Sequence, residues 1–193
     1  MHVVAFFAFA GDPPGGREGH RGSASSSLLA WRYRHGFGSV CLLKTGCQPE
    51  ASSFTFAELF AGIGGFRVGL ESLGGRCVFS SEIEPFTREL YTRNFGDVPA
   101  GDIQEVQGVS VPAHDLLVAG FPCQPFSALG DQPGFEDSKG LLFREIVRIL
   151  RSTRTPMFLL ENVPGLAQCD EGKALRAIRD ELRRAGYEVG THF

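Results

Sequence analysis

Residues 115–127 read Asp115-Leu116-Leu117-Val118-Ala119-Gly120-Phe121-Pro122-Cys123-Gln124-Pro125-Phe126-Ser127. The stretch begins as a short apolar run typical of a buried strand, and it breaks at Gly120 before a turn that contains prolines. In an open α/β sheet, ligands bind in the crevice outside the carboxyl ends of the strands. A buried cysteine is usually inert, but this position favours exposure, so Cys123 is a candidate nucleophile.

From Phe54 onward, apolar runs of strand type alternate with patterns of helical period. The apolar runs predict strands at 54–60, 77–83, 98–103, 116–119, 157–160 and 187–193. The helical patterns predict helices at 66–73, 85–96, 140–151 and 172–185. Strands that alternate with helices indicate βαβ units, and therefore an α/β fold with a mostly parallel, Rossmann-like sheet and helices on both faces.

The bulk composition is that of an ordinary globular protein, with 42% hydrophobic and 21% charged residues in a chain of 193. A net charge of -3 gives no support to a broad polyanion-binding surface, although a local groove can be basic on an acidic domain. The five cysteines are scattered without a Cys-x-x-Cys pair, so no metal site is expected. We expect a reduced, cytoplasmic compartment, and no apolar run is long enough to span a bilayer.

The first 53 residues differ from the rest, because they are rich in glycine and serine and show no sustained periodicity. The apolar segment 1–10 lacks the basic residues that begin a signal peptide. We therefore expect residues 1–53 to be a low-complexity, disordered extension, or upstream sequence included by a misplaced start. The folded domain is expected at 54–193.

A glycine-rich turn follows the first predicted strand and reads Ala61-Gly62-Ile63-Gly64-Gly65. Glycines allow the backbone of such a turn to approach a ligand closely. Glu82 ends the next strand, where dinucleotide-binding folds place a carboxylate that binds ribose hydroxyls. Because the glycine spacing is not G-x-G-x-x-G, we expect an adenosine-containing cofactor other than a nicotinamide. An ordinary βα turn with a surface glutamate is the alternative interpretation.

Two further acidic residues come directly after predicted strands. Asp102 is placed to accept a hydrogen bond from an adenine amino group while Ile103 packs on the ring, and a simple turn aspartate is the alternative. Glu161 ends an apolar strand and is a candidate general acid if burial raises its pKa, with an exposed strand-end glutamate as the alternative.

Five stretches occur together, in the order and at the spacing of a known family. They are Phe60-Ala61-Gly62-Ile63-Gly64-Gly65-Phe66, Gly101-Asp102-Ile103, Gly120-Phe121-Pro122-Cys123-Gln124-Pro125-Phe126-Ser127, Gly134-Phe135-Glu136-Asp137-Ser138-Lys139-Gly140 and Glu161-Asn162-Val163. With them, the chain resembles the cytosine-5 DNA methyltransferases over about residues 54–193. The resemblance implies an S-adenosylmethionine-dependent methyltransferase sheet, with S-adenosylhomocysteine as the product of the cofactor and no metal.

The resemblance also implies a role for each matching residue. The cofactor would be bound by Phe60, Ala61, Gly62, Ile63, Gly64, Gly65, Glu82, Ile83, Asp102, Ile103, Pro122 and Leu142. Cys123 would add as thiolate to C6 of a flipped-out cytosine, while Glu161 would protonate its N3. The substrate side would hold Gln124, Ser127, Asn162 and Val163. The partner would be double-stranded DNA, and no membrane would be involved. In a bacterium, the protein would be associated with the nucleoid.

The sequence departs from the family pattern after residue 193. Family members continue with a Gln-x-Arg-x-Arg-type stretch, a target-recognition domain and a closing segment, so we expect a truncated or split enzyme. Such a chain would be weak or inactive without a second polypeptide, and its sheet would be incomplete at the C-terminus. In the family an antiparallel seventh strand lies between the fifth and sixth, so residues 187–193 are expected to be frayed or mispaired.

Two other functions stay open at this point. A methyltransferase that acts on tRNA cytosine shares the fold and the motifs. A non-catalytic cofactor-binding or interaction module would also retain them. A third function, an NAD-dependent enzyme, is disfavoured by the glycine spacing.

Overall fold

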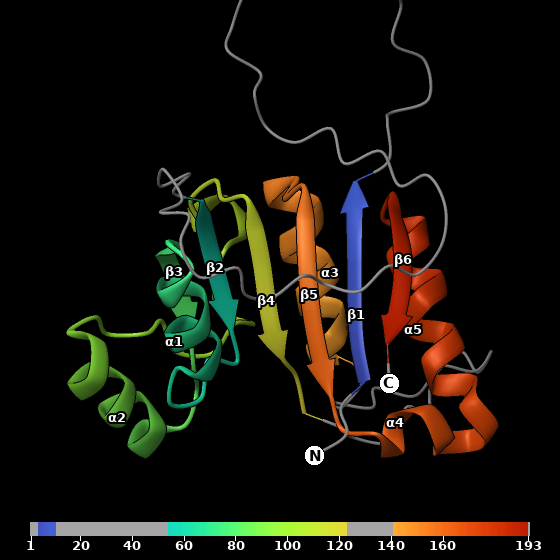
Figure 1. Ribbon diagram of the computed structural model, residues 1–193, viewed down its shortest axis with the longest axis horizontal. Helices are drawn as coiled ribbons and strands as arrows, with labels where there is room; N and C mark the ends of the chain where they lie inside the picture. Colours follow the sequence, from blue (N-terminus) through green and yellow to red (C-terminus); the bar gives the residue numbers. More distant parts are fainter. Residues whose placement is uncertain (1–3, 11–53, 123–140, 193) are drawn as a thin grey trace, which may run out of the picture. The chain divides into compact units, whose positions relative to one another are not determined.

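The computed structural model describes residues 4–10, 54–122 and 141–192. These residues form a six-stranded sheet with the order β3-β2-β4-β5-β1-β6 (Figure 1). The strands are β1 (Val4–Ala10), β2 (Thr55–Leu59), β3 (Arg76–Ser81), β4 (Leu116–Gly120), β5 (Met157–Asn162) and β6 (Tyr187–His192). The helices are α1 (Gly65–Ser72), α2 (Pro85–Phe95), α3 (Leu141–Thr153), α4 (Gly165–Gln168) and α5 (Lys173–Arg184), with short 3-10 turns at Gly108–Ser110 and Cys169–Gly172.

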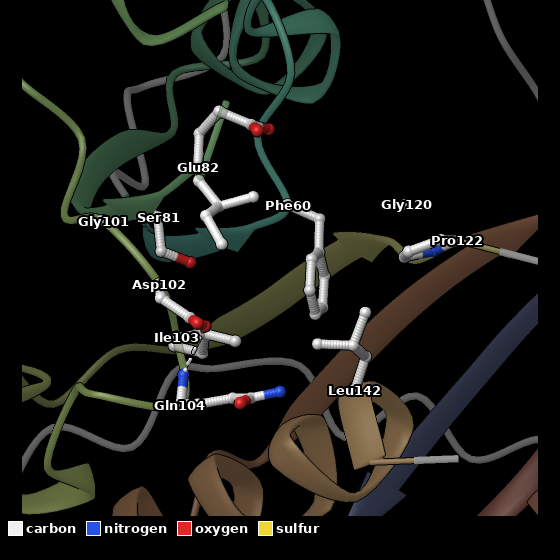
Figure 2. A pocket seen from close by; sticks show the side chains of 11 residues that line it. Phe60, Ser81, Glu82, Gly101, Asp102, Ile103, Gln104, Gly120, Pro122 and Leu142 are labelled. Carbon is white, nitrogen blue, oxygen red and sulfur yellow. Dashed lines mark hydrogen bonds between the residues drawn. The ribbon is translucent and has the colours of Figure 1, made fainter. Parts of the chain in front are cut away.

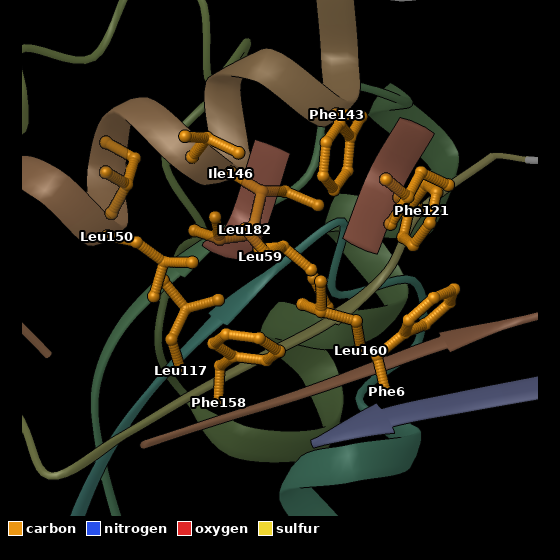
Figure 3. Packing of buried hydrophobic residues seen from close by; sticks show 14 of the residues in the cluster. Phe6, Leu59, Leu117, Phe121, Phe143, Ile146, Leu150, Phe158, Leu160 and Leu182 are labelled. Atoms are coloured by element: carbon orange, nitrogen blue, oxygen red, sulfur yellow. The ribbon is translucent and has the colours of Figure 1, made fainter. Parts of the chain in front are cut away.

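The alternation of side chains along the strands produces two packed layers. In β2, Ala57 and Leu59 point into the main core, where they join apolar residues of α3 and α5. Glu58, between them, points to the opposite face, where it meets Tyr91 of α2. Figure 3 shows Phe143 of α3 and Leu182 of α5 among the residues of the main core. The expected α/β sheet with helices on both faces is confirmed.

The parallel part of the sheet follows the prediction closely. β2 pairs in parallel with β3 and β4, and β4 pairs in parallel with β5. The strand expected at 98–103 is wrong, because a single bridge between Ser81 and Ala100 stands in its place. Pro99 lacks the backbone N–H that a longer ladder would require. No helix in the described ranges has the length and apolar character needed to cross a bilayer.

The expectation of a disordered extension at 1–53 is wrong for Val4–Ala10, which forms β1. This strand runs antiparallel to β5 on one side and to β6 on the other. Residues 187–193 were expected to be frayed or mispaired. The frayed alternative is wrong, because Tyr187–His192 forms a complete ladder with β1, a partner that the prediction did not include. Residues 11–53 lie outside the described residues. Strand β1 was missed because its partners β5 and β6 lie more than a hundred residues away in the sequence. No pattern within residues 1–10 indicates this pairing.

Candidate active site

A cavity of about 330 Å³ opens at the carboxyl ends of β2, β3 and β4 (Figure 2). Its volume falls within the range of small-molecule pockets, roughly 300–1,000 Å³. It is lined by Phe60, Ser81, Glu82, Ile83, Gly101, Asp102, Ile103, Gln104, Gly120, Pro122 and Leu142. Seven of these are residues expected to bind a cofactor: Phe60, Glu82, Ile83, Asp102, Ile103, Pro122 and Leu142.

The backbone turns sharply where β2 enters the cavity. Phe60 has a φ of 54°, a left-handed conformation that is uncommon for a residue with a large side chain. Figure 2 shows its ring pointing across the cavity toward Leu142. Strained backbone of this kind persists only where its surroundings enforce it, and it is concentrated at functional sites. The sequence carried no signal of this conformation, because φ at Phe60 depends on the packing around the turn.

The residues of turn 61–65 support the cavity wall without lining it. Ala61 is buried and donates its backbone N–H to the carbonyl of Ser81 at 2.9 Å. Gly64 has a φ of 92°, and a Cβ there would lie 2.1 Å from the ring of Phe95. Ile63 is largely exposed. The turn therefore depends on glycine at position 64 for both its conformation and its packing.

Glu82 joins the end of β3 to the glycine turn. Its Oε2 accepts a hydrogen bond from the backbone N–H of Gly62 at 2.8 Å, and its Oε1 accepts one from Glu84 at 2.9 Å. Each carboxylate oxygen has two lone pairs, so the group keeps the capacity to accept hydroxyl donors from a ligand. The side chain that was predicted to bind ribose is thus held in place by the turn beside it.

Asp102 and Ile103 form the opposite wall of the cavity. Asp102 Oδ1 accepts a hydrogen bond from the backbone N–H of Gln104 at 2.9 Å, which closes a local turn. Ile103 is 3% exposed and belongs mainly to the hydrophobic core. It therefore presents only a small apolar surface to the cavity, whereas Ile83, which is 62% exposed, has more surface to offer a flat ring.

The ends of β4 and β5 lie side by side, with Gly120 opposite Glu161 in the ladder. A Cβ at Gly120 would lie 3.3 Å from Glu161 Oε2, so glycine leaves room for this carboxylate. Asn162 is buried and donates from Nδ2 to the carbonyl of Phe121 at 2.8 Å. Its Oδ1 accepts from the N–H of Val163 at 2.9 Å. Asn162 thereby fixes the chain that leaves β4 against the chain that leaves β5.

The remaining predicted site residues divide into two groups. Val163 follows β5 and is half exposed. Cys123, Gln124 and Ser127 lie outside the described residues, as does the 134–140 stretch. The described residues bring the cavity wall and Glu161 to the same edge of the sheet, and Cys123 directly follows Pro122 in the sequence.

A buried polar network lies behind the turn, on the α1–α2 face of the sheet. Glu58 Oε2 accepts from the Tyr91 hydroxyl at 3.1 Å, and that hydroxyl accepts from Arg67 Nη1 at 3.3 Å. Arg67 also donates to Asp97 at 2.6 Å and stacks over Phe95, 4.5 Å from its ring centre. Burial raises the pKa of Glu58 to about 7, and hydrogen bonds from Tyr91 and from backbone amides at the start of α1 offset only part of this effect. Burial alone would lower the pKa of Arg67, but its hydrogen bonds to Tyr91, Asp97 and Glu71 raise it above its ordinary value.

Sequence reasoning assigned no role to four residues that line the cavity: Ser81, Gly101, Gln104 and Gly120. Ser81, Gly101 and Gln104 adjoin residues that were assigned one, and Gly120 lies two positions before Pro122, so a rule that includes residues within two positions of an assigned residue would have found all four. The network of Glu58, Tyr91 and Arg67 was missed for a different reason. Its members are far apart in the sequence, and each has the pattern of an ordinary strand or helix residue.

A family model described as C-5 cytosine-specific DNA methylase matches residues 54–193. The type II methyltransferase M.MspI of Moraxella sp is 52% identical over 140 residues, which are 72% of this chain and 34% of that protein. M.HpaII of Haemophilus parainfluenzae is 48% identical over 74% of this chain and 42% of its own length. M.HhaI of Haemophilus parahaemolyticus is 44% identical over 72% of this chain and 43% of its own length. The chain thus spans about a third to two fifths of the length of these relatives.

Solved structures agree on the fold. The S. pombe Dnmt2 methyltransferase superposes with a TM-score of 0.55 at 25% identity, covering 68% of this chain and 42% of that chain. A putative DNA modification methyltransferase encoded within an E. coli prophage gives a TM-score of 0.54 at 22% identity, covering 68% of this chain and 38% of that chain.

Proposed function

Because the chain belongs to the family of C-5 cytosine-specific DNA methylases, we propose that it is the cofactor-binding and catalytic part of a DNA cytosine-5 methyltransferase. The observation that carries this proposal is the cavity beside Glu161. It gathers an aromatic ring, two carboxylates and exposed apolar side chains where the strand β4 leads to Cys123.

The described residues fit S-adenosylmethionine as the cofactor. Glu82 offers carboxylate oxygens to ribose hydroxyls, Asp102 offers one to an adenine amino group, and Ile83 offers an exposed apolar surface to the adenine ring. Phe60, Pro122 and Leu142 supply the remaining apolar wall. When bound, the cofactor supplies an electrophilic methyl group. No cluster of metal-ligating side chains occurs among the described residues.

The protein's own residues would perform the chemistry on the base. A cytosine stacked in a duplex does not expose C6, so the base must be flipped out. Cys123, as thiolate, would add to C6, and Glu161 would protonate N3 and so make the ring electrophilic. After C5 is methylated, loss of the C5 proton and departure of the thiol would restore the aromatic ring. Asn162 would keep Glu161 and the chain toward Cys123 in register.

This chain covers only part of the length of each relative, so binding of the cofactor and turnover on DNA need not require the same set of residues. Because the chain spans 34% of M.MspI, we infer that full activity on double-stranded DNA requires residues beyond the 193 present here, in the same polypeptide or in a second one. The chain alone would then bind the cofactor and transfer methyl groups weakly or not at all.

The proposal is tested by transfer of a labelled methyl group from S-adenosylmethionine to duplex DNA. We expect C5-methylcytosine when the chain is combined with a polypeptide that comprises the remaining part of a relative such as M.MspI, and none with Cys123→Ser. Cys77→Ser is the matched control, because Cys77 is a half-buried thiol outside the cavity. Methylation that is unchanged in Cys123→Ser, or that favours tRNA over duplex DNA, would contradict the proposal.

A further inference from the structure

Strand β1 lies in a slot between β5 and β6 and runs antiparallel to both (Figure 1). The other paired strands among the described residues are parallel. Adjacent strands are separated by about 4.8 Å, so β5 and β6 stand two such spacings apart, with room for one strand. Without an occupant, the N–H and C=O groups that line both sides of the slot would lose their partners.

The slot and its occupant come from different parts of the chain. β5 and β6 belong to residues 54–193, which the family model matches, whereas β1 lies outside that match. We propose that the slot is a docking site for an extended apolar strand, that residues 4–10 of the same chain occupy it, and that docking positions Glu161 and Asn162. The consequence for Glu161 rests on the proposed function, whereas the docking itself does not.

The side chains of β1 match the two faces of the slot. Phe6 and Ala8 point into the core and are 0% and 2% exposed. Burial of this phenylalanine side chain stabilises the docked strand. On the other face, the ring of Phe7 covers Gly190 of β6, where an added Cβ would lie 2.5 Å from the ring. The slot therefore selects a strand with an apolar inward face, and the half-exposed ring of Phe7 adds a weaker contact on the outer face.

The register links β1 to the candidate active site. Because β1 is antiparallel to β5, its first residues lie at the carboxyl edge of the sheet. Val4 pairs with Asn162, and Ala5 pairs with Glu161. On its other side, Glu161 pairs with Gly120 of β4. The backbone of Glu161 is thus held from both sides, and one of the two supports is the N-terminal strand.

Amide hydrogen exchange on the full chain tests the docking with a matched pair of variants. Phe6→Ser removes the inward anchor, and Phe7→Ser makes the same change on the outer face of the same strand, where Phe7 is 46% exposed. We expect Phe6→Ser to reduce the protection of Tyr187–His192 by about 100-fold, whereas Phe7→Ser has a much smaller effect. Thr55–Leu59 should stay protected in both variants. Unchanged protection of Tyr187–His192 in Phe6→Ser would overturn the proposal.

Two further measurements keep the test decisive if Phe6→Ser unfolds. In the first, Ala8→Cys is combined with Val189→Cys, which faces it in the ladder, or with Thr191→Cys, which does not. We expect a disulfide within one chain for the first pair and little for the second. Equal cross-linking of both pairs, or linkage only between copies, would overturn the assignment of residues 4–10 to the slot.

In the second, a solubilised peptide of residues 1–12 is added to the Phe6→Ser chain. The peptide should restore protection of Tyr187–His192, and a scrambled peptide should not. In the 193-residue chain, Phe6→Ser should also reduce the amide protection of Glu161 and Asn162 and leave the affinity for S-adenosylmethionine unchanged, because β1 does not line the cavity. Failure of cofactor binding in the wild-type chain would count against the proposed function, whereas loss of the ladder register would count against docking.

Discussion

Gly64 is the residue on which the shape of the turn at residues 61–65 depends most. It combines a φ of 92° with a ring contact that leaves no space for a Cβ. The adjacent Gly65 differs on both counts, because its φ is not left-handed and no described atom lies within 4 Å of an added Cβ. Glycine is therefore required at position 64, whereas position 65 has room for a side chain.

We predict that Gly64→Ala lowers the free energy of unfolding by about 2–4 kcal/mol, from left-handed strain and the clash with Phe95 together. Gly65→Ala should change it by less than about 1 kcal/mol. Urea denaturation of both variants measures the difference. Equal effects of the two substitutions would show that the ring contact at Gly64 does not constrain the turn.

The free energy of unfolding should depend on pH through the ionisation of Glu58. Its pKa is raised from 4.5 to about 7, so between these values the folded protein binds more protons than the unfolded chain. Its contribution is therefore fully present below pH 4.5 and is lost as the pH rises to about 7. A pKa difference of this size between the folded and unfolded states corresponds to about 3 kcal/mol of free energy of unfolding.

We predict that wild type loses stability relative to Glu58→Gln across this window, by up to about 3 kcal/mol. Denaturation of both proteins between pH 4.5 and 8 measures the change. Glu105→Gln controls for the loss of one exposed charge. A constant difference between wild type and Glu58→Gln at every pH would mean that Glu58 titrates normally in the fold.

At the scale of elements, the strand ends of the parallel sheet were readable from sequence, and β1 was not. Three of the parallel strands reach a glycine or an acidic residue at their ends: β3 is followed by Glu82, β4 ends at Gly120 and β5 ends just after Glu161. Glu82, Asp102 and Ile103 could be placed in the cavity from these strand ends, whereas Phe60, Ile83, Pro122 and Leu142 were assigned through the resemblance to the family. β1 is held in the sheet by burial of the Phe6 side chain and by backbone hydrogen bonds to β5 and β6. Both depend on residues far away in the sequence, so residues 1–10 alone do not predict the pairing.

The contact between β4 and β5 makes a prediction of its own. Gly120→Ala would place a Cβ 3.3 Å from Glu161 Oε2 and displace the carboxylate by a few tenths of an ångström. We expect kcat of the complemented enzyme to fall about tenfold, with little change in the free energy of unfolding. Gly165→Ala is the control, because the nearest described atom to its Cβ is 4.0 Å away. A similar kcat for the two variants would remove Glu161 from the rate-limiting chemistry.

At the scale of the whole molecule, the described residues join a strand-end cavity, the end of β5 with Glu161 and the strand β1 in one sheet. The cavity depends on β2, β3, β4 and α3, whereas β1 supports the far side of β5. Cofactor binding should therefore be the property that the 193-residue chain retains most fully, independent of its turnover on DNA.

The central claim is that this cavity binds S-adenosylmethionine, and calorimetry on the 193-residue chain tests it most directly. We predict one equivalent of S-adenosylmethionine bound and no detectable binding of NAD. Glu82→Ala should weaken the affinity about 10- to 100-fold through loss of charge-assisted hydrogen bonds to ribose. Glu84→Ala, which removes a nearby carboxylate outside the cavity, should leave it unchanged. Absence of binding, binding of NAD instead, or equal effects of the two substitutions would contradict the account.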